Sequence, residues 1–403
     1  MSKSFWIETL GCPKNQVDSE KIAGTLLSDG LSPADSPTDA NLIVINTCSF
    51  IEEAREESIE TVFELSQLRD DGTELVVTGC LAERYGDEIA STLKDDVDAV
   101  VGFGVPVSIT SKPEVPKFDL LNLPRPKREE PWGYVKVAEG CDRICGFCAI
   151  PSFRGPQRSR SIADIREEVL SLDVQEIVLV AQDLASWGRD RRDSDERVVD
   201  LVKEISDLVP WVRLLYLYPS SLTGELLVII AGSPVPYFDL SLQHVSAPLL
   251  RKMRRWGDGE RFSNIISQIR KLQPEAAFRT NFIVGYPGET EEDHDRLIRF
   301  IEENMIDWCG FFPYSKEEGT YAATLHEEIP ETLILERLRE LSELQDVITQ
   351  KNRDSLIGSD VTVLVESSGV ARSHREAPEI DGLIIVSDNL KVGSFETVTI
   401  QEA

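Results

Sequence analysis

The stretch "YVKVAEGCDRICGFC" (134–148) joins an apolar, strand-like run to three cysteines at spacings of four and three residues. Iron–sulfur clusters are held by cysteine thiolates, and a cuboidal 4Fe-4S cluster has four irons to ligate. With Cys141, Cys145 and Cys148 as ligands, one iron stays open. An open coordination position is typical of a catalytic metal centre, whereas structural sites are closed. The stretch therefore predicts a reactive cluster in the loop that follows a strand.

A structural zinc site is the alternative interpretation, because Cys-x-x-Cys is a common zinc half-site. A closed zinc site needs a fourth Cys or His nearby. The histidines of the chain all lie far from this loop in the sequence, at His244, His294, His326 and His374. The cluster is therefore the favoured interpretation.

Downstream of the loop, strand-like apolar runs recur at intervals that mostly have room for a helix, which predicts an α/β domain. Six such units favour a partly closed parallel (β/α)6 barrel with its active site at the carboxyl ends of the strands. A flat doubly wound sheet is the alternative. The six runs occupy residues 134–140, 176–182, 212–218, 237–243, 278–285 and 308–314, and a long helix is expected over 332–356.

The sequence on either side of this barrel changes character, and four regions are expected. Residues 1–110 alternate strand-like runs (4–9, 41–47, 74–79 and 98–102) with amphipathic segments, which predicts a small, mostly parallel α/β domain. The Pro-rich, charged stretch 111–131 is typical of a linker. The barrel domain is expected over 132–350. Residues 351–403 hold strand-like runs without helical spacing (361–367, 382–387 and 395–400), which predicts a small all-β module.

A second set of cysteines follows the first three predicted strands of the N-terminal domain, at Cys12, Cys48 and Cys80. The carboxyl ends of parallel strands share one edge of a sheet, where ligand crevices form. Three thiols that converge there are suited to a second cluster, again with one open iron. The alternative is three unrelated buried cysteines, since free Cys is among the most buried residue types. Cys309, inside the apolar run "DWCGFF", is expected to have that inert core role.

Composition limits the class of protein. A chain of 403 residues favours two or three domains, and 41% hydrophobic with 28% charged residues is typical of a globular protein. No run is long enough to span a membrane and the start lacks a signal peptide, so the cytoplasm is the expected location. Seven cysteines in a reducing compartment argue against a disulfide framework. The net charge of −29 repels nucleic acid and attracts a basic partner, unless the acidic surface serves solubility alone.

The cysteine loop resembles the signature of the radical S-adenosylmethionine (SAM) superfamily, Cys-x-x-x-Cys-x-x-Cys with an aromatic before the last cysteine, here Phe147. The resemblance implies that SAM binds the open iron and is cleaved to a 5′-deoxyadenosyl radical. It also implies SAM contacts at Gln182 and Asp183, which end the second barrel strand. In "FIVGYPGET" (282–290), Gly285 would allow the backbone to approach adenine closely.

The whole chain is similar to the methylthiotransferases, and within them to the branch that modifies a ribosomal protein (RimO type). The motifs that carry this resemblance are "TLGCPKNQVDSE" (9–20), "KVAEGCDRICGFCAIPSFRGPQRSR" (136–160), "SLQHVSAPLLRKMRR" (241–255), "YSKEEGTYAATL" (314–325) and "APEIDG" (377–382). The tRNA-modifying branch usually has Cys-Gln-Met-Asn where this chain has Cys-Pro-Lys-Asn.

The resemblance implies an N-terminal domain with an auxiliary 4Fe-4S cluster on Cys12, Cys48 and Cys80, a radical SAM barrel and a C-terminal TRAM domain. The implied reaction adds a methylthio group to the β-carbon of an aspartate of the twelfth small-subunit ribosomal protein, with two SAM molecules and two 4Fe-4S clusters. A reducing electron donor such as flavodoxin or ferredoxin is implied as well, and a monomer is expected.

Charge favours the ribosomal-protein branch, because residues 351–403 carry five Lys or Arg against nine Asp or Glu. RNA binding calls for a basic face instead. Two alternatives stay open: a tRNA adenosine methylthiotransferase, and a non-catalytic iron–sulfur protein that transfers electrons or senses redox state.

Overall fold

The computed structural model describes residues 3–103 and 119–403, which form two compact units. The first unit holds the described residues up to 127 together with 134–142 and 148–172, and the second holds 128–133, 143–147 and 173–403. The end of the predicted N-terminal domain and the first part of the predicted linker, residues 104–118, lie outside the described residues.

In the described part of the first unit, a five-stranded parallel sheet has the strand order β2–β1–β3–β4–β5. The four predicted strands all form, and β2 is an additional two-residue edge strand. Their bounds are β1 Ser4–Thr9, β2 Ser32–Pro33, β3 Leu42–Thr47, β4 Glu74–Gly79 and β5 Ala99–Val100.

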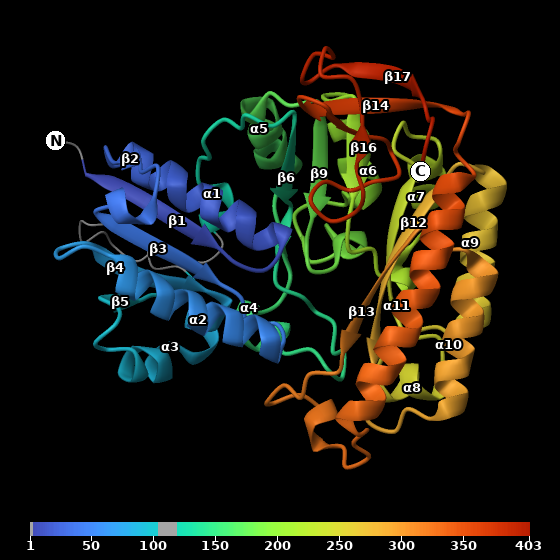
Figure 1. Ribbon diagram of the computed structural model, residues 1–403, viewed down its shortest axis with the longest axis horizontal. Helices are drawn as coiled ribbons and strands as arrows, with labels where there is room; N and C mark the ends of the chain where they lie inside the picture. Colours follow the sequence, from blue (N-terminus) through green and yellow to red (C-terminus); the bar gives the residue numbers. More distant parts are fainter. Residues whose placement is uncertain (1–2, 104–118) are drawn as a thin grey trace. The chain divides into compact units, whose positions relative to one another are not determined.

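Helices cover both faces of this sheet, which is why every residue of β3 is buried and its first four residues are all apolar. Helix α1 (Pro13–Ser28) packs Leu26 on one face. Helices α2 (Glu52–Leu68) and α3 (Cys80–Thr92) pack on the other, as Figure 1 shows. The unit also contains α4 (Ile150–Arg154), α5 (Ile162–Leu172) and the antiparallel pair β7 (Ala138–Glu139) and β8 (Arg158–Ser159).

The second unit contains the barrel, and its strands are parallel as predicted. One set is β9 (Glu176–Val180) beside β10 (Trp211–Leu214). The other is β11 (Tyr237–Gln243), β12 (Ala277–Val284) and β13 (Trp308–Pro313) in that order. A bridge between Leu217 and Leu240 joins the two sets. The first predicted strand also forms, as β6 (Trp132–Lys136), and the carbonyl of Pro131 before it accepts the amides of Gln175 and Glu176.

Two predicted barrel strands are shorter than expected, and the predicted runs 98–102 and 382–387 form only the two-residue strands β5 and β16 (Ile384–Ile385). The run 134–140 is split, because β7 leaves the line of β6 to pair with β8. The run 212–218 ends at Leu214, because Tyr216 adopts a left-handed backbone conformation (φ 64°) that an extended strand cannot contain.

Helices separate the barrel strands, and α11 confirms the predicted long helix. Their bounds are α6 Val198–Ser206, α7 Gly224–Ala231, α8 Ala247–Lys252, α9 Gly259–Leu272, α10 Glu291–Asn304 and α11 Glu331–Asp354. Short 3-10 turns occur at η1 Pro37–Asp39, η2 Asp119–Asn122, η3 Leu184–Ser186, η4 Pro219–Ser221 and η5 Ala322–Thr324. In the described residues, no helix has the length and apolar character needed to cross a bilayer.

The C-terminal residues form an antiparallel sheet in the order β16–β15–β14–β17, which confirms the predicted all-β module. The strands are β14 Asp360–Ser367, β15 Val370–Arg372, β16 Ile384–Ile385 and β17 Phe395–Thr399. Sequence reasoning missed β15, which has only three residues and follows a tight turn at Gly369 (φ 79°).

This module packs against the amino ends of the barrel strands. Glu176, the first residue of β9, forms an ion pair with Arg372 of the module at 2.7 Å. Tyr237, the first residue of β11, donates its hydroxyl to Asp381 at 2.6 Å. Trp308, the first of β13, donates to the carbonyl of Arg375. Figure 1 shows the module, in red, at the end of the barrel from which β13 runs away. The carboxyl ends of the strands therefore remain clear of it.

Candidate iron–sulfur and SAM sites

The structure brings the three N-terminal cysteines together at one edge of the first sheet. Cys12 caps α1 just after β1, Cys48 directly follows β3, and Cys80 directly follows β4 as the first residue of α3. Each thiol is close enough to affect the ionisation of another: Cys80 and Cys12 both raise the pKa of Cys48, and Cys12 raises that of Cys80. The predicted convergence of these side chains is thus observed, while their role as cluster ligands stays a prediction.

Glycine makes this close approach possible. Gly79 has φ 94°, and a Cβ there would lie only 2.5 Å from the carbonyl oxygen of Thr47. Gly11 has φ 99°, and a Cβ there would lie 2.8 Å from the Cβ of Cys48. The residue before Cys12 and the residue before Cys80 must therefore both lack a side chain.

A buried amide, Asn15, links the three cysteine loops. Its Nδ2 donates to the carbonyl of Leu10, two residues before Cys12, at 2.8 Å, and to that of Thr47, next to Cys48, at 3.1 Å. Its Oδ1 lies 3.7 Å from the Sγ of Cys80. The side chain is fully buried, so these contacts hold the loops without competition from water.

Burial acts to raise the pKa of all three thiols, and nearby positive charge opposes it. It raises the pKa of Cys48 to about 12, with the neighbouring thiols adding to the effect. Burial also raises the pKa of Cys80, and Arg154 opposes it only in part. At Cys12 burial acts in the same direction, but Lys14, Arg154 and hydrogen bonds from the backbone of Lys14 and Asn15 outweigh it and lower the pKa. The thiols of Cys48 and Cys80 therefore need bound cations, such as cluster irons, to become thiolates.

The donor set is of the kind that a 4Fe-4S cluster takes, since such clusters are held by cysteine thiolates. In the part of the chain that the structure describes, no three His, Cys, Asp or Glu side chains are placed to hold one metal ion. A 4Fe-4S cluster takes its thiolates on separate irons, so its ligands lie further apart than those of one zinc. The helix N-termini at Cys12 and Cys80 also favour thiolate charge.

The second cysteine set lies in an irregular loop between β7 and α4, and its three members are half-buried. In the first unit, the amide of Cys141 donates to the carbonyl of Gly155 at 3.0 Å. In the second unit, Arg255 donates to the Sγ of Cys145 at 3.3 Å, and the amide of Gly146 donates to Met253 at 2.8 Å. Phe147, the predicted aromatic, is half-buried.

The predicted SAM contacts at the end of β9 occupy a polar environment. Asp183 is buried, and its Oδ2 accepts from Arg143 at 2.7 Å and from Ser186 at 2.7 Å. Its Oδ1 is also buried, yet it has no hydrogen-bond partner among the described residues. An unsatisfied buried carboxylate oxygen suits an ammonium group, as the predicted role in binding SAM requires. Gln182, next to it in the chain, is half-buried.

The local structure itself explains why residue 285 is a glycine. Its φ is 80°, and a Cβ there would lie 2.5 Å from the side chain of Ile334 on α11. Its amide donates to the buried carboxylate of Glu289 at 2.7 Å. The close approach in this structure is therefore to α11, and a contact with adenine stays a prediction. In β13, Cys309 is half-buried and its pKa is strongly raised by burial, in line with an inert thiol.

Sequence reasoning missed the polar residues that hold these sites, namely Asn15, Arg143, Arg154 and Arg255. Arg154 donates to the Sγ of Cys80 at 2.9 Å, just as Arg255 donates to that of Cys145. Arg143 and Arg255 both stack on the ring of Tyr218, at 3.9 and 4.3 Å from its centroid. All four lie inside motifs quoted above, but a lone Arg or Asn in sequence carries no sign of what it contacts after folding.

Comparison with known proteins agrees with this architecture. Three family models match: the uncharacterized protein family UPF0004 over residues 4–102, the radical SAM superfamily over 135–301 and the TRAM domain over 357–403. The chain is also similar in fold to a radical S-adenosylmethionine methyltransferase, TsrM from Kitasatospora setae, with a TM-score of 0.50 and 13% identity over 96% of this chain and 80% of that one.

Two relatives are similar over nearly their whole length. Ribosomal protein uS12 methylthiotransferase RimO from Moorella thermoacetica is 39% identical over 98% of this chain and 95% of its own. The protein of the same name from Aquifex aeolicus is 39% identical over 98% and 94%. The chain therefore belongs to the ribosomal protein uS12 methylthiotransferase (RimO) family of radical SAM enzymes.

Proposed function

We propose that the protein adds a methylthio group to the β-carbon of an aspartate in ribosomal protein uS12, using two SAM molecules and two 4Fe-4S clusters. The observation that carries the proposal is the presence of two cysteine triplets in a chain so similar to the RimO relatives. Each triplet would leave one iron open. When bound, the clusters and SAM supply the radical that removes hydrogen and the sulfur that replaces it.

The residues of the chain bind and orient these groups. Cys141, Cys145 and Cys148 would hold the cluster that binds SAM, with Phe147 beside them. Cys12, Cys48 and Cys80 would hold the auxiliary cluster. Asp183 offers its free Oδ1 to the ammonium of SAM, with Gln182 and Gly285 as further SAM contacts.

The domains would be 1–110, 111–131 as a linker, 132–350 and 351–403. The three family models each fall within one of these domains.

The small number of exposed cations in the C-terminal residues supports a basic protein, and not RNA, as the substrate. Of the five Lys and Arg in residues 351–403, Arg372 is buried in ion pairs with Glu176 and Glu366, and Arg375 pairs with Asp307 at 3.2 Å. Lys351, Arg353 and Lys391 remain exposed. This is too little positive surface for an RNA-binding face. The proposal also includes an electron donor such as flavodoxin or ferredoxin, a monomeric enzyme and a cytoplasmic location.

The decisive experiment compares two substrates by mass spectrometry. Purified small-subunit ribosomal proteins and unmodified tRNA are each incubated anaerobically with the reconstituted protein, SAM and dithionite. We expect a methylthio mass gain on uS12 alone, localised to one aspartate. A gain on tRNA alone would reassign the substrate, and reversible cluster reduction without SAM turnover would indicate an electron-transfer protein.

Cysteine variants separate the two proposed clusters. Replacing Cys141, Cys145 or Cys148 with Ala should abolish 5′-deoxyadenosine formation. Replacing Cys12, Cys48 or Cys80 should leave part of SAM cleavage and stop sulfur insertion, both followed by chromatography of the products. Cys309→Ala is the control, since that thiol is inert in the proposal. Undiminished sulfur insertion in Cys80→Ala would contradict the assignment.

A further inference from the structure

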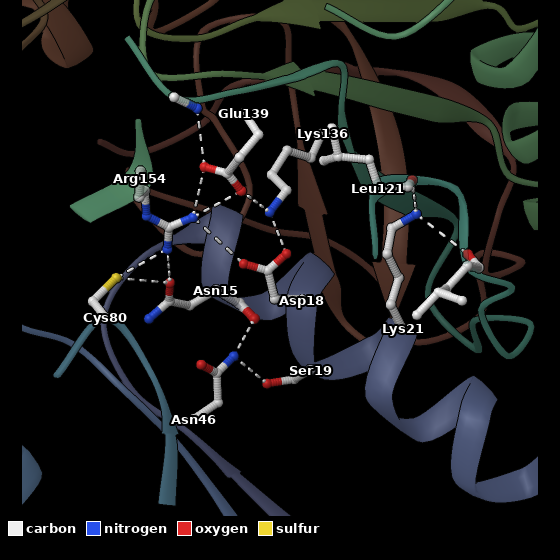
Figure 2. A network of polar contacts seen from close by, with 12 residues as sticks. Asn15, Asp18, Ser19, Lys21, Asn46, Cys80, Leu121, Lys136, Glu139 and Arg154 are labelled. Atoms are coloured by element: carbon white, nitrogen blue, oxygen red, sulfur yellow. Dashed lines mark hydrogen bonds and ion pairs between the residues drawn. The ribbon is translucent and has the colours of Figure 1, made fainter. Parts of the chain in front are cut away.

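The guanidinium of Arg154 contacts a proposed ligand of the auxiliary cluster (Figure 2). Its Nη2 donates to the Sγ of Cys80 at 2.9 Å and to the Oδ1 of Asn15 at 2.9 Å. Its Nη1 donates to both carboxylate oxygens of Glu139, at 2.9 and 3.0 Å. Arg154 is only 3% exposed, so the contact with sulfur is shielded from water.

The charge of Arg154 is balanced without the thiol. Lys136 forms ion pairs with Glu139 at 2.8 Å and with Asp18, and the Nη1 of Arg154 lies 3.6 Å from the Oδ2 of Asp18. Two cations thus meet two carboxylates in one buried network. The carboxylates fix the orientation of the guanidinium, and an N–H group is left to point at Cys80.

Packing brings Arg154 to this position. It is the last residue of α4, a helix that begins two residues after Cys148. The preceding residue, Phe153, forms an apolar cluster with Cys80 and Ala149. The helix that follows the SAM-cluster loop is therefore anchored on a cysteine of the other set.

We propose that Arg154 is a positioning residue of the auxiliary cluster: it fixes the Cys80 thiolate and raises the reduction potential of the cluster held there. This inference rests on the proposed function. Hydrogen bonds to the sulfurs and net charge are among the features that set the potential of such clusters. One-electron reduction adds negative charge to a cluster, and an N–H donor at a ligating sulfur stabilises the added charge.

The test isolates the auxiliary cluster and measures its potential. In a full-length background with Cys141→Ala, Cys145→Ala and Cys148→Ala, only the N-terminal triplet can hold a cluster. The midpoint potential is measured by a dithionite titration with mediator dyes, followed by electron paramagnetic resonance, and iron is counted in each sample. Arg154→Gln is expected to lower the midpoint potential.

Lys136→Gln is the matched control, because it removes one buried cation from the same network but makes no contact with sulfur. Its potential should shift less than that of Arg154→Gln. Arg154→Lys, which keeps the charge and an N–H donor, should recover part of the shift. The double variant Glu139→Gln with Arg154→Gln removes one charge of each sign and leaves Lys136 paired with Asp18. Because its buried charges stay balanced, it provides a second measurement without the guanidinium if Arg154→Gln alone misfolds.

The outcomes are distinct. Equal potentials in Arg154→Gln and Lys136→Gln, or no shift in the double variant, would overturn the role of Arg154 while leaving the proposed function intact. Loss of iron in Arg154→Gln but not in Lys136→Gln would support positioning directly. A background protein that binds no iron would instead refute the auxiliary cluster itself, and the inference with it.

Discussion

Asn15 shows how much of the candidate site depends on one buried side chain. Its amide group satisfies the backbone beside Cys12 and beside Cys48, and it accepts from Arg154. Its own carbonyl accepts from the side chain of Asn46 at 2.8 Å, as Figure 2 shows. The "CPKN" motif thus supplies both a proposed ligand and the amide that orders the loops of the other two.

We expect Asn15→Leu to destabilise the protein and to empty the auxiliary site. The substitution leaves buried carbonyls and a guanidinium N–H without partners, at a cost of about 1–3 kcal/mol for each group. Chemical denaturation measures the stability and iron analysis of the background protein measures the site. The control is Asn41→Leu, since Asn41 is exposed and its side-chain oxygen accepts hydrogen bonds from Ser4, the first residue of β1, whereas the cysteines follow the other ends of the strands. Equal iron content in both variants would contradict the linking role of Asn15.

At this scale the sequence predicts residue types but not partners. The six proposed ligands follow from the chemistry of cysteine and from the position of each after a strand. Arg154 reaches Cys80 across 74 positions of the chain, and Asn15 reaches Thr47 across 32. Such pairs depend on tertiary packing, and no local spacing rule encodes them.

At the scale of elements, the turn from β4 into α3 is set by Gly79. The turn places Cys80 at the same sheet edge as Cys48, which follows β3. At Gly79 the turn has no room for a side chain. The long apolar strands were predictable because their two buried faces require continuous hydrophobic runs. Strands of two or three residues, such as β2 and β15, are too short to show a period, which is why they were missed.

Gly79→Ala should therefore disturb the sheet edge at which the N-terminal cysteines converge, and Gly72→Ala provides a matched control. Both glycines have positive φ, at 94° and 92°, so both variants incur backbone strain of about 1 kcal/mol or more. Only at Gly79 would the added methyl group also collide with the end of β3, at Asn46 and Thr47, since nothing lies within 4 Å at Gly72. We expect loss of cluster iron in Gly79→Ala alone, measured after reconstitution. Parallel loss in both variants would mean that strain, and not the collision, is responsible.

At the scale of the whole molecule, a buried ion-pair network fastens the C-terminal module to the barrel. Glu176 is fully buried and pairs with Arg213 and Arg372, both at 2.7 Å. Arg213 also donates to the carbonyl of His374 in the module at 2.8 Å. The module's family and its β character were predictable from the sequence, but its attachment was not, because Glu176 and Arg372 lie 196 positions apart.

Glu176→Gln should loosen this attachment. Arg213 would lose its counter-charge and Arg372 would keep only Glu366, and breaking a buried pair costs about 3–5 kcal/mol. Limited proteolysis should release the module faster, with the exposed pair Lys203–Glu225 as control: Glu225→Gln should change the rate little, since surface pairs contribute about 0–1 kcal/mol. Unchanged proteolysis in Glu176→Gln would show that other contacts suffice.

The same carboxylate predicts an acid-sensitive attachment. Burial would raise the pKa of Glu176, but Arg372 and Arg213 outweigh burial and lower it. A depressed pKa means that the stabilisation is complete above the ordinary glutamate pKa of about 4.3 and is lost as the pH falls through the lower folded value. Proteolytic release measured from pH 7 downward with an acid-stable protease should accelerate in the wild type, and less so in Glu176→Gln.

The placement of the module at the amino ends of the strands sets a distance rule for the target. The proposed chemistry occurs at the opposite ends, and β12 alone, with eight residues, spans ~26 Å at ~3.3 Å per residue. A target that touches the module and presents its aspartate at the barrel mouth must bridge that length. The length of the barrel would then select target proteins in which the segment that binds the module and the modified aspartate are separated by this distance. A short peptide around the aspartate would bind only at the barrel mouth.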